Sequence, residues 1–323
     1  MEDFLAREYA IYTKETVSID GKEGFKNKEY TYFIIPSENK EMMYIEQAVL
    51  SYYLHENGYL QTAYPIPNRS GKWFTKDKQT SYIVVQLANQ RPSSQQSYGH
   101  RLADLHQLGR RYRYEPREIS SYGQWQRLWI DKLEMFEYQL TEQAKLTPHP
   151  YYQLVIDMLP YIIGLSENAI QYVRESEKEQ RYHEGDQGTI TFHRYRSDLL
   201  HSVIWFNELA YDHPARDIAE YIRTQFLETN KTEDDIALFM KDYQMRMPIS
   251  VFGWRQIYGR LIYPVHLFDV LEKGFFSEDL DEQLEHVMKK VSQQEVYEKR
   301  LRSLFKMIEI DNVALRIPVL HWL

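Results

Sequence analysis

GTITFHRYRSDLLHSVIWFNE, residues 188–208, is the stretch that decides how the rest of this chain is interpreted. Within it, TITF and SVIWF are short runs of β-branched and aromatic residues, which are typical of strands. The polar residues between the two runs indicate a brief turn. We therefore expect a hairpin near residues 189–206, set into a part of the chain whose other segments have a helical pattern.

Apolar residues recur at helical spacing on both sides of this hairpin. Leu102 and Leu105 share one helix face, and Leu154, Met158 and Ile162 begin a second stripe. The longest stripe is formed by Trp125, Leu128, Leu133, Phe136 and Leu140. Residues from about 98 onward are therefore expected to be mostly helical, with the hairpin as the exception.

The first ninety residues show a strand pattern around one helix. YTYFII at 30–35 is closed by Pro36, and SYIVVQL at 81–87 is the clearest strand in the chain. Between these strands, Ile45, Val49 and Tyr52 fall at helical spacing, which predicts a helix near residues 41–57.

A polar segment containing proline and serine, residues 88–98, separates the two regions and is typical of a hinge. The order of elements predicts an α+β, bilobal fold of the protein-kinase-like kind. Its small, antiparallel β-rich N-terminal lobe would comprise residues 1–90, and its large, mostly helical C-terminal lobe residues 91–323.

Composition and charge exclude several classes of function. The formal net charge of -8 gives no support to the binding of nucleic acid or of an anionic membrane surface. No apolar run is long enough to span a bilayer, and the N-terminus lacks the apolar segment of a signal peptide, so we expect synthesis in the cytoplasm. The chain has no cysteine, which excludes disulfides, thiolate metal sites and a cysteine nucleophile.

Three stretches occur in an order that resembles the aminoglycoside phosphotransferases and choline kinases, a protein-kinase-like superfamily. LADLHQLGR at 102–110 is similar to the family's LAxLH helix, and HPARDIAEYI at 213–222 resembles the DPxxDLA segment that opens a later helix. TFHRYRSDLLHSVIWFN at 191–207 lies where the family places its catalytic loop and metal-binding strand. The resemblance implies the same bilobal fold.

Within this superfamily the chain is most similar to bacterial spore coat proteins of the CotS and YutH type. Its length, its 27 tyrosines and the stretch MPISVFGWRQIYGRLIYPVHLFDVLEKGFF at 247–276 carry this resemblance. It implies a protein made without a signal peptide in the mother cell, located in the spore coat and associated with other coat proteins. It does not indicate an oligomeric state.

Phosphoryl transfer in kinase-like enzymes needs a strand lysine, a loop aspartate that accepts a proton, and an asparagine and a second aspartate that hold the metal. The resemblance places Ile35 at the lysine position, Tyr195 at the loop aspartate, Leu200 at the asparagine and Trp205 at the metal aspartate. A phenol is protonated at neutral pH, and an indole only donates hydrogen bonds. These positions therefore imply a degenerate site.

Other family positions are retained or have nearby substitutes. His193 matches the first residue of the loop, and Glu46 remains in the helix that supplies the lysine's partner. Asp217 matches a structural aspartate, so we expect it to be buried and bonded to backbone N–H groups near His193. Asp198 and Asn207 carry oxygens close to the loop and are the candidate substitutes for the missing metal ligands.

If Tyr195 and Trp205 replace the two aspartates, both rings are expected in the space between the lobes. There they would fill the volume that a metal and phosphates occupy in active relatives. The leading hypothesis is therefore a non-catalytic kinase-like protein, or pseudokinase, with a structural or assembly role in the endospore coat and no cofactor.

Two alternatives stay open. One is a small-molecule phosphotransferase that uses ATP and Mg²⁺ through relocated ligands, and the other is a pseudoenzyme that binds a nucleotide without hydrolysing it. The degenerate positions favour a protein that is not an enzyme, and the number of carboxylates in the cleft would separate the hypotheses.

Overall fold

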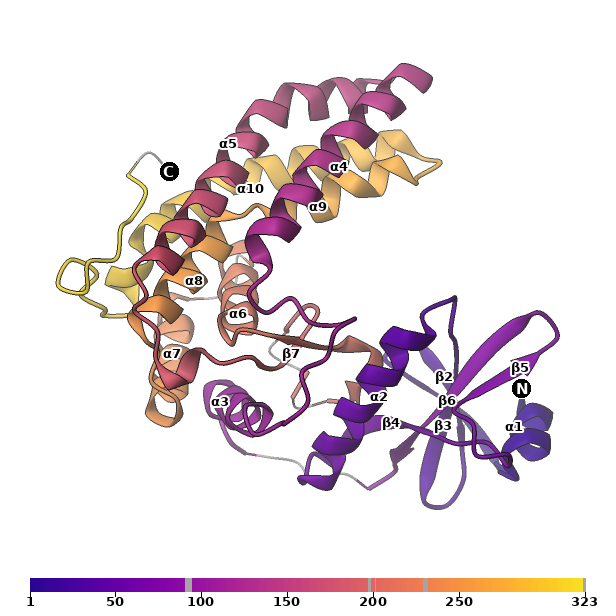
Figure 1. Ribbon diagram of the computed structural model, residues 1–323. Helices are drawn as coiled ribbons and strands as arrows, with labels where there is room; N and C mark the ends of the chain where they lie inside the picture. Colours follow the sequence, from indigo (N-terminus) through magenta and orange to yellow (C-terminus); the bar gives the residue numbers. More distant parts are fainter. Residues whose placement is uncertain (91–94, 197–198, 201, 229–231, 322–323) are drawn as a thin grey trace.

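The protein has a β-rich N-terminal part and a mostly helical C-terminal part (Figure 1). The computed structural model describes residues 1–90, 95–196, 199–200, 202–228 and 232–321. This architecture confirms the predicted α+β fold class with a small β-rich and a large helical portion. The exact division at about residue 90 stays a prediction.

Strands from the first ninety residues form a mainly antiparallel sheet. They are β1 (Glu15–Ile19), β2 (Lys22–Lys26), β3 (Tyr30–Pro36), β4 (Thr62–Ile66), β5 (Phe74–Asp77) and β6 (Thr80–Ala88). Their order in space is β1-β2-β3-β6-β4, and β5 also pairs with β6. Asp20 and Gly21, which join β1 to β2, have φ angles of 50° and 74°. Positive φ at both central residues characterises the two-residue type I′ turn, which an Asp-Gly pair favours.

Two helices accompany this sheet. Helix α1 (Glu2–Tyr9) buries Phe4 and Leu5 in an apolar cluster with Tyr32 of β3. Helix α2 (Glu41–Glu56) confirms the helix expected near 41–57.

The apolar residues whose spacing predicted α2 do not mark its buried side. Ile45 is 36% and Val49 is 38% exposed, whereas the polar residues Gln47 and Ser51 are fully buried. Gln47 is buried because α2 packs there against backbone carbonyls of the C-terminal part, to which its amide donates, whereas Ser51 donates to the carbonyl of Ala48 within α2. The exposed apolar positions follow the same helical period on another face.

Helices dominate the C-terminal part. They are α3 (Tyr98–Gly109), α4 (Trp125–Leu146), α5 (Pro150–Lys178), α6 (Ala215–Leu227), α7 (Glu233–Arg246), α8 (Val251–Ile262), α9 (Val265–Leu271) and α10 (Leu280–Met307). The described residues also form the short 3-10 helices η1 (Glu184–Asp186), η2 (Phe206–Glu208) and η3 (Glu272–Phe275). The long helices α4, α5 and α10 extend away from the remaining helices at the top of Figure 1. Among the described residues, no helix is both long and apolar enough to cross a membrane.

The expected hairpin between TITF and SVIWF is wrong. Strand β7 (Thr189–Phe192) pairs antiparallel with β9 (Leu209–Asp212), and β8 (Ile204–Trp205) pairs in parallel with β4 of the N-terminal sheet. Strand patterns do not identify the partner strand. Here Val203 and Trp205 bury their side chains in an apolar cluster with residues of the sheet, so β8 leaves the helical part and completes the sheet edge.

Candidate functional site

The residues that resemble a catalytic loop lie between β7 and β9. Backbone pairing of these two strands continues one residue beyond β7, because the N–H of His193 donates to the carbonyl of Glu208 at 2.9 Å. The start of the loop is thereby fixed next to η2, which follows Trp205. The first residue of the loop, His193, therefore lies beside the last residue of η2, Glu208.

Tyr195 lies in the core of the helical part. It is 1% exposed, and its ring centroid lies 5.7 Å from that of Phe192. Its hydroxyl has no hydrogen-bond partner among the described residues. Burial raises the pKa of this phenol well above its ordinary value, so it cannot accept a proton as a carboxylate would.

Tyr195 and Trp205 belong to two different apolar clusters. The expectation that both rings share the space between the lobes is therefore wrong for Tyr195. A neutral ring can be buried among the helices, whereas a carboxylate at this position would need a partner there.

Trp205 lies against the turn between β1 and β2. Its indole Nε1 donates a hydrogen bond of 2.9 Å to Oδ2 of Asp20, and Nζ of Lys22 lies 4.4 Å from the ring centroid. The ring meets Phe33 of β3 edge-on, with the centroids 4.8 Å apart and an interplanar angle of 87°. Trp205 is 1% exposed, so these contacts exclude water from the indole.

We call the apolar residues around this indole the sheet cluster. Its buried members are Phe33, Tyr44, Ala63, Ile83, Val85, Leu87, Val203, Trp205 and Phe206. Ile35 packs against it as a partly buried residue on the same face of β3 as Phe33, two positions away. Because the sequence of β3 is YTYFIIP, no shift of alignment along this strand introduces the lysine that phosphoryl transfer requires.

Leu200, at the position of the metal-binding asparagine, is fully buried in the helical core. Its backbone carbonyl accepts a hydrogen bond of 3.4 Å from Nε2 of Gln61. Its side chain supplies packing and no ligand oxygen.

Gln47 of α2 reaches the start of the loop. Its Nε2 lies 2.8 Å from the carbonyl oxygen of Leu209, 3.2 Å from that of Asn207 and 3.1 Å from Nε2 of His193. Burial and the nearby Arg216 lower the pKa of His193 to about 4. The imidazole is therefore neutral at pH 7, and its Nε2 can accept the proton of the Gln47 amide.

Glu46 contacts the backbone of the helical part instead of a strand residue. Its Oε1 accepts from the N–H of Arg117 at 2.8 Å, and its Oε2 from the N–H groups of Glu118 and Ile119 at 2.8 and 3.1 Å. Three backbone donors on one carboxylate make a strong, charge-assisted connection. The side chain thus fastens α2 to the segment before α4.

Of the two proposed substitute ligands, Asn207 lies among the described residues. Asn207 lies in η2, and its Oδ1 is buried without a hydrogen-bond partner in the described part of the chain. Asp198 lies outside the described residues. Within the residues that the structure does describe, no group of three or more His, Asp or Glu side chains is arranged to hold a metal ion.

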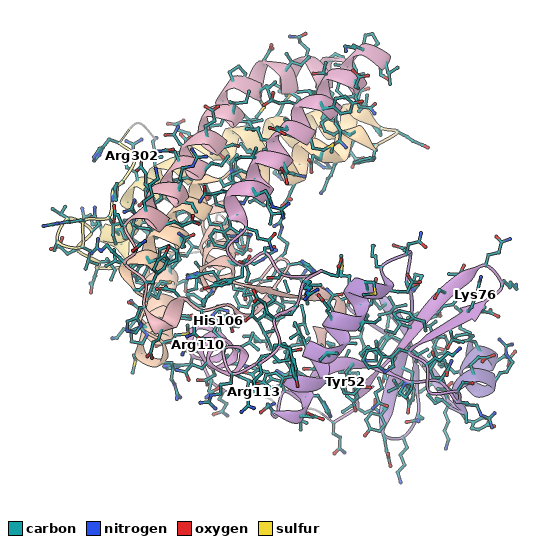
Figure 2. All side chains as sticks on the ribbon, in the orientation of Figure 1. Tyr52, Lys76, His106, Arg110, Arg113 and Arg302 are labelled. Carbon is teal, nitrogen blue, oxygen red and sulfur yellow. The ribbon has the colours of Figure 1, made fainter. Side chains whose placement is uncertain are left out.

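Asp217 stands where the sequence predicts it. It is fully buried in α6, and its Oδ1 accepts a hydrogen bond of 3.1 Å from the N–H of Phe192, the residue before His193. Its Oδ2 lies 3.2 Å from Nε2 of His106 on α3, which Figure 2 labels within the helical part. The expected backbone contact is therefore present, and a histidine completes it.

His106 connects Asp217 to a third helix. Its Nδ1 lies 2.8 Å from the hydroxyl of Tyr243 on α7. Burial lowers the pKa of His106 and raises that of Asp217. A neutral imidazole that donates from Nε2 to Asp217 and accepts from Tyr243 at Nδ1 satisfies both contacts without a buried cation.

Two site residues, Asp20 and Gln47, escaped the sequence analysis. Asp20 could have been found from its Asp-Gly pair, which signals a tight turn between strands. For Gln47 there was no signal, because a buried amide in a helix has no pattern that distinguishes it from an exposed one.

Comparison with known proteins agrees with this geometry. A family model described as "Spore coat putative kinase YutH" matches residues 2–304. The endospore coat-associated protein YutH of Bacillus subtilis (strain 168) is 28% identical over 310 residues, which cover 93% of this chain and 91% of that protein.

Solved structures share the fold at lower sequence identity. An aminoglycoside phosphotransferase from Alicyclobacillus acidocaldarius has a TM-score of 0.64 and 14% identity, with 96% of each chain covered. Spectinomycin phosphotransferase with AMP bound has a TM-score of 0.58 and 12% identity, with 92% of this chain and 96% of that chain covered. At these identities the likeness shows a kinase-like fold and nothing about activity.

Proposed function

The chain belongs to the YutH family of spore coat proteins, and from this premise we propose that it is an endospore coat-associated protein that does not transfer phosphoryl groups. Its kinase-like fold would serve as a surface for binding and assembly with other coat proteins. The similarity to the coat-associated relative of Bacillus subtilis supports the coat assignment. The residues around Trp205 support the absence of catalysis.

The contact between Trp205 and the β1–β2 turn carries this proposal. In protein kinases a glycine-rich loop covers the nucleotide phosphates, and an aspartate beside them holds the metal. Here the turn has one glycine, Gly21, and its neighbours Asp20 and Lys22 both contact the indole at the predicted metal-aspartate position. An indole offers no lone pair to a hard cation, and its ring occupies volume under the turn.

The other parts of the machinery point in the same direction. The face of β3 that carries Phe33 and Ile35 belongs to the sheet cluster and supplies no lysine to a triphosphate. Tyr195 remains a protonated phenol inside the helical core, and Leu200 has no ligand oxygen. The described residues at these positions therefore do not fit a magnesium nucleotide.

One observation favours the runner-up, a small-molecule phosphotransferase with relocated ligands. The side-chain oxygen of Asn207 is buried without a partner among the described residues, beside the predicted metal strand. A buried acceptor left unpaired is costly, and a cation would satisfy it. A carboxylate would have to join Asn207 for this reading to hold, and Asp198 is the residue proposed for it.

Nucleotide binding tests the choice between these functions. The full chain would be titrated with ATP, with and without Mg²⁺, and followed by calorimetry and thermal unfolding, with the AMP-binding spectinomycin phosphotransferase as a positive control. Ligand at tenfold excess over its dissociation constant would stabilise a binding protein by about 1.4 kcal/mol. We expect no stabilisation of this protein. Magnesium-dependent ATP turnover that is lost in Asp198→Ala and Asn207→Ala would establish the runner-up.

Coat association needs a separate test. A fluorescent fusion of this chain would be produced during sporulation in Bacillus subtilis that lacks its own relative. We expect the fusion to collect around the forespore. Fluorescence that stays evenly distributed in the mother cell would contradict the coat assignment and leave the result on nucleotide binding unaffected.

A further inference from the structure

A cavity of about 230 Å³ lies in the helical part, between α4, α9 and the loop after β7. It is lined by Ser121, Trp125, Leu128, Trp129, Lys132, Arg194, Arg216, Arg260, Tyr263, Val265, Phe268 and Asp269. Neither the sheet cluster nor the contacts of Trp205 contribute to it. We refer to it as the arginine cavity.

Most of the charged side chains that line the arginine cavity are cationic, although the chain as a whole is acidic. Its lining contains four cationic side chains, Lys132, Arg194, Arg216 and Arg260, and one carboxylate, Asp269. The chain as a whole has 47 acidic and 39 basic residues. Each of these cations also pairs with a carboxylate, namely Glu272, Asp269, Asp212 or Glu220, so the cavity offers cationic hydrogen-bond donors at its surface without a large net charge.

Arg216 and Arg260 are largely buried, and each has a hydrogen-bond donor without a partner among the described residues. The side chains of Arg216 and Arg260 are 10% and 5% exposed, and they pair with Asp212 at 2.9 Å and with Glu220 at 3.1 Å. The Nε of each arginine is nevertheless buried without a hydrogen-bond partner among the described residues. Burial lowers the pKa of Arg260 to about 10, which leaves it charged at neutral pH. These two Nε atoms have almost no accessible surface, so an anion in the cavity would meet the terminal nitrogens of the guanidinium groups.

The side chains of the other two cations are more exposed, and Arg194 also lies 3.9 Å from the buried carboxylate of Glu220. Lys132 pairs with Glu272 at 2.5 Å, and Arg194 pairs with Asp269 at 2.7 Å, with the cationic side chains 40% and 49% exposed. Exposed pairs of this kind contribute little stability. A bound anion can therefore attract both cations at small cost.

Stacked aromatic rings form one wall. Trp125 and Trp129 stack at 5.6 Å and 21°, and Trp129 and Tyr263 stack at 4.4 Å and 9°. The guanidinium of Arg260 lies 4.9 Å from the ring of Trp125. The stacked rings are 3–5% exposed, so the wall presents apolar ring edges with a cation beside them. An apolar group can pack against these edges while its anionic substituent meets the guanidinium.

We propose that the arginine cavity binds a small molecule that carries a carboxylate or a phosphate on a flat apolar body. The cavity is smaller than the roughly 300–1,000 Å³ of sites for drug-sized ligands, so the ligand has about the size of one substituted aromatic ring. This inference goes beyond the proposed function and does not rest on it, because an anion can bind there whether or not a nucleotide does.

Calorimetric titration of the full chain with matched probes tests the proposal. Phenyl phosphate and benzoate carry both features, inorganic phosphate carries the charge alone, benzyl alcohol is neutral, and benzylamine is cationic. We expect at least one of the two aromatic anions to bind about tenfold or more tightly than the neutral and cationic probes. The dissociation constants of phenyl phosphate and benzoate then identify the preferred anionic group. The difference in affinity between phenyl phosphate and inorganic phosphate gives the contribution of the ring.

Variants at the rim locate the binding. The double change Lys132→Gln with Arg194→Gln removes the two exposed cations and leaves the buried pairs intact, and we expect it to weaken the tighter aromatic anion about tenfold. Arg127→Gln, on α4 but outside the cavity lining, is the matched control and should bind as the unaltered chain does. The proposal is overturned if neither aromatic anion binds below about 10 mM. Equal binding of benzylamine, or unchanged binding by a folded double variant, would overturn it too.

Discussion

Trp205 and Asp20 are 185 positions apart in the chain and are joined by a hydrogen bond of 2.9 Å from the indole Nε1 to the carboxylate. This contact connects the first turn of the sheet to the strand that follows the loop of the helical part. Lys22, on the other side of the same turn, places its ammonium 4.4 Å from the indole ring. One aromatic side chain thereby holds both residues that flank Gly21.

Removal of this indole is expected to destabilise the protein strongly. Trp205→Ala leaves a cavity in the sheet cluster and frees the β1–β2 turn, which should lower the free energy of unfolding by about 3–5 kcal/mol. Urea denaturation would measure the loss. Trp73→Ala is the matched control, since Trp73 is only partly buried and stacks on one ring, Tyr52. A loss from Trp205→Ala no larger than that of the control would contradict the structural role.

Restoring the two aspartates should not restore catalysis. We expect the double change Tyr195→Asp with Trp205→Asp to show no ATP turnover in a coupled assay, because β3 still lacks a lysine and Leu200 supplies no ligand. A folding check by circular dichroism is needed, since both substitutions place a carboxylate at a buried position. Strong turnover in this variant would mean that the site was disabled at those two positions alone.

Asp217 is expected to matter for stability. Asp217→Ala leaves the N–H of Phe192 and the ring of His106 without their acceptor, which should cost about 1–3 kcal/mol in the free energy of unfolding. Asp234→Ala, at an exposed position in the first turn of α7, is the control. If the two variants unfold at the same urea concentration, Asp217 has no such role.

The contact between the Glu46 carboxylate and the backbone of residues 117–119 can be tested by comparing two substitutions on α2. Glu46→Gln keeps the shape of the side chain but removes the charge and one of the two acceptor oxygens that bind residues 117–119, so we expect a loss of about 1–3 kcal/mol. Glu56→Gln, at the exposed end of the same helix, should change stability by less than about 0.5 kcal/mol. Equal effects of the two substitutions would argue against this contact.

Stability should fall in mild acid partly through His266. Burial, helped by Arg223, lowers the pKa of this imidazole to about 3 in the folded protein, whereas an unfolded histidine titrates near 6.5. The unfolded state therefore takes up a proton first as the pH falls below 6.5, and stability declines until about pH 3. One proton corresponds to about 1.4 kcal/mol per pH unit.

The matched measurement compares urea unfolding at pH 7 and pH 5 for the unaltered chain, for His266→Gln and for the exposed-site control His286→Gln. His266→Gln should lose less stability between the two pH values than the other two proteins. Identical losses in all three would show that His266 does not titrate in this way.

The sequence predicted the elements of the site better than their partners. The helix near 41–57, the strands at 30–35 and 81–87 and the backbone contact of Asp217 all follow from local patterns that survive in the fold. The prediction of a hairpin was wrong because β7 pairs with β9, which follows β8 in the sequence, while β8 pairs with β4. Strand pairing depends on which strand edge is free in space. Runs of β-branched residues carry no information about that choice.

The two aromatic residues at the predicted aspartate positions lie in different clusters for a similar reason. Tyr195 and Trp205 were predicted to lie together because the aspartates they replace act in the same phosphoryl-transfer site. Because neither side chain is charged, the two need no common ligand. Tyr195 packs against Phe192 in one cluster, and Trp205 packs against Phe33 in the other. A family alignment gives the position of a residue, but the rotamer follows from local packing.

The position of β8 affects how this chain must be synthesised. The edge of β4 receives its neighbour only when Ile204 and Trp205 have left the ribosome, roughly 140 residues after β4 itself. At translation speeds of about 5–20 residues per second, the nascent N-terminal sheet keeps an open edge for on the order of ten seconds. Open edges recruit strands from other chains. Premature association of nascent chains is therefore expected to be greatest while translation is between β4 and β8.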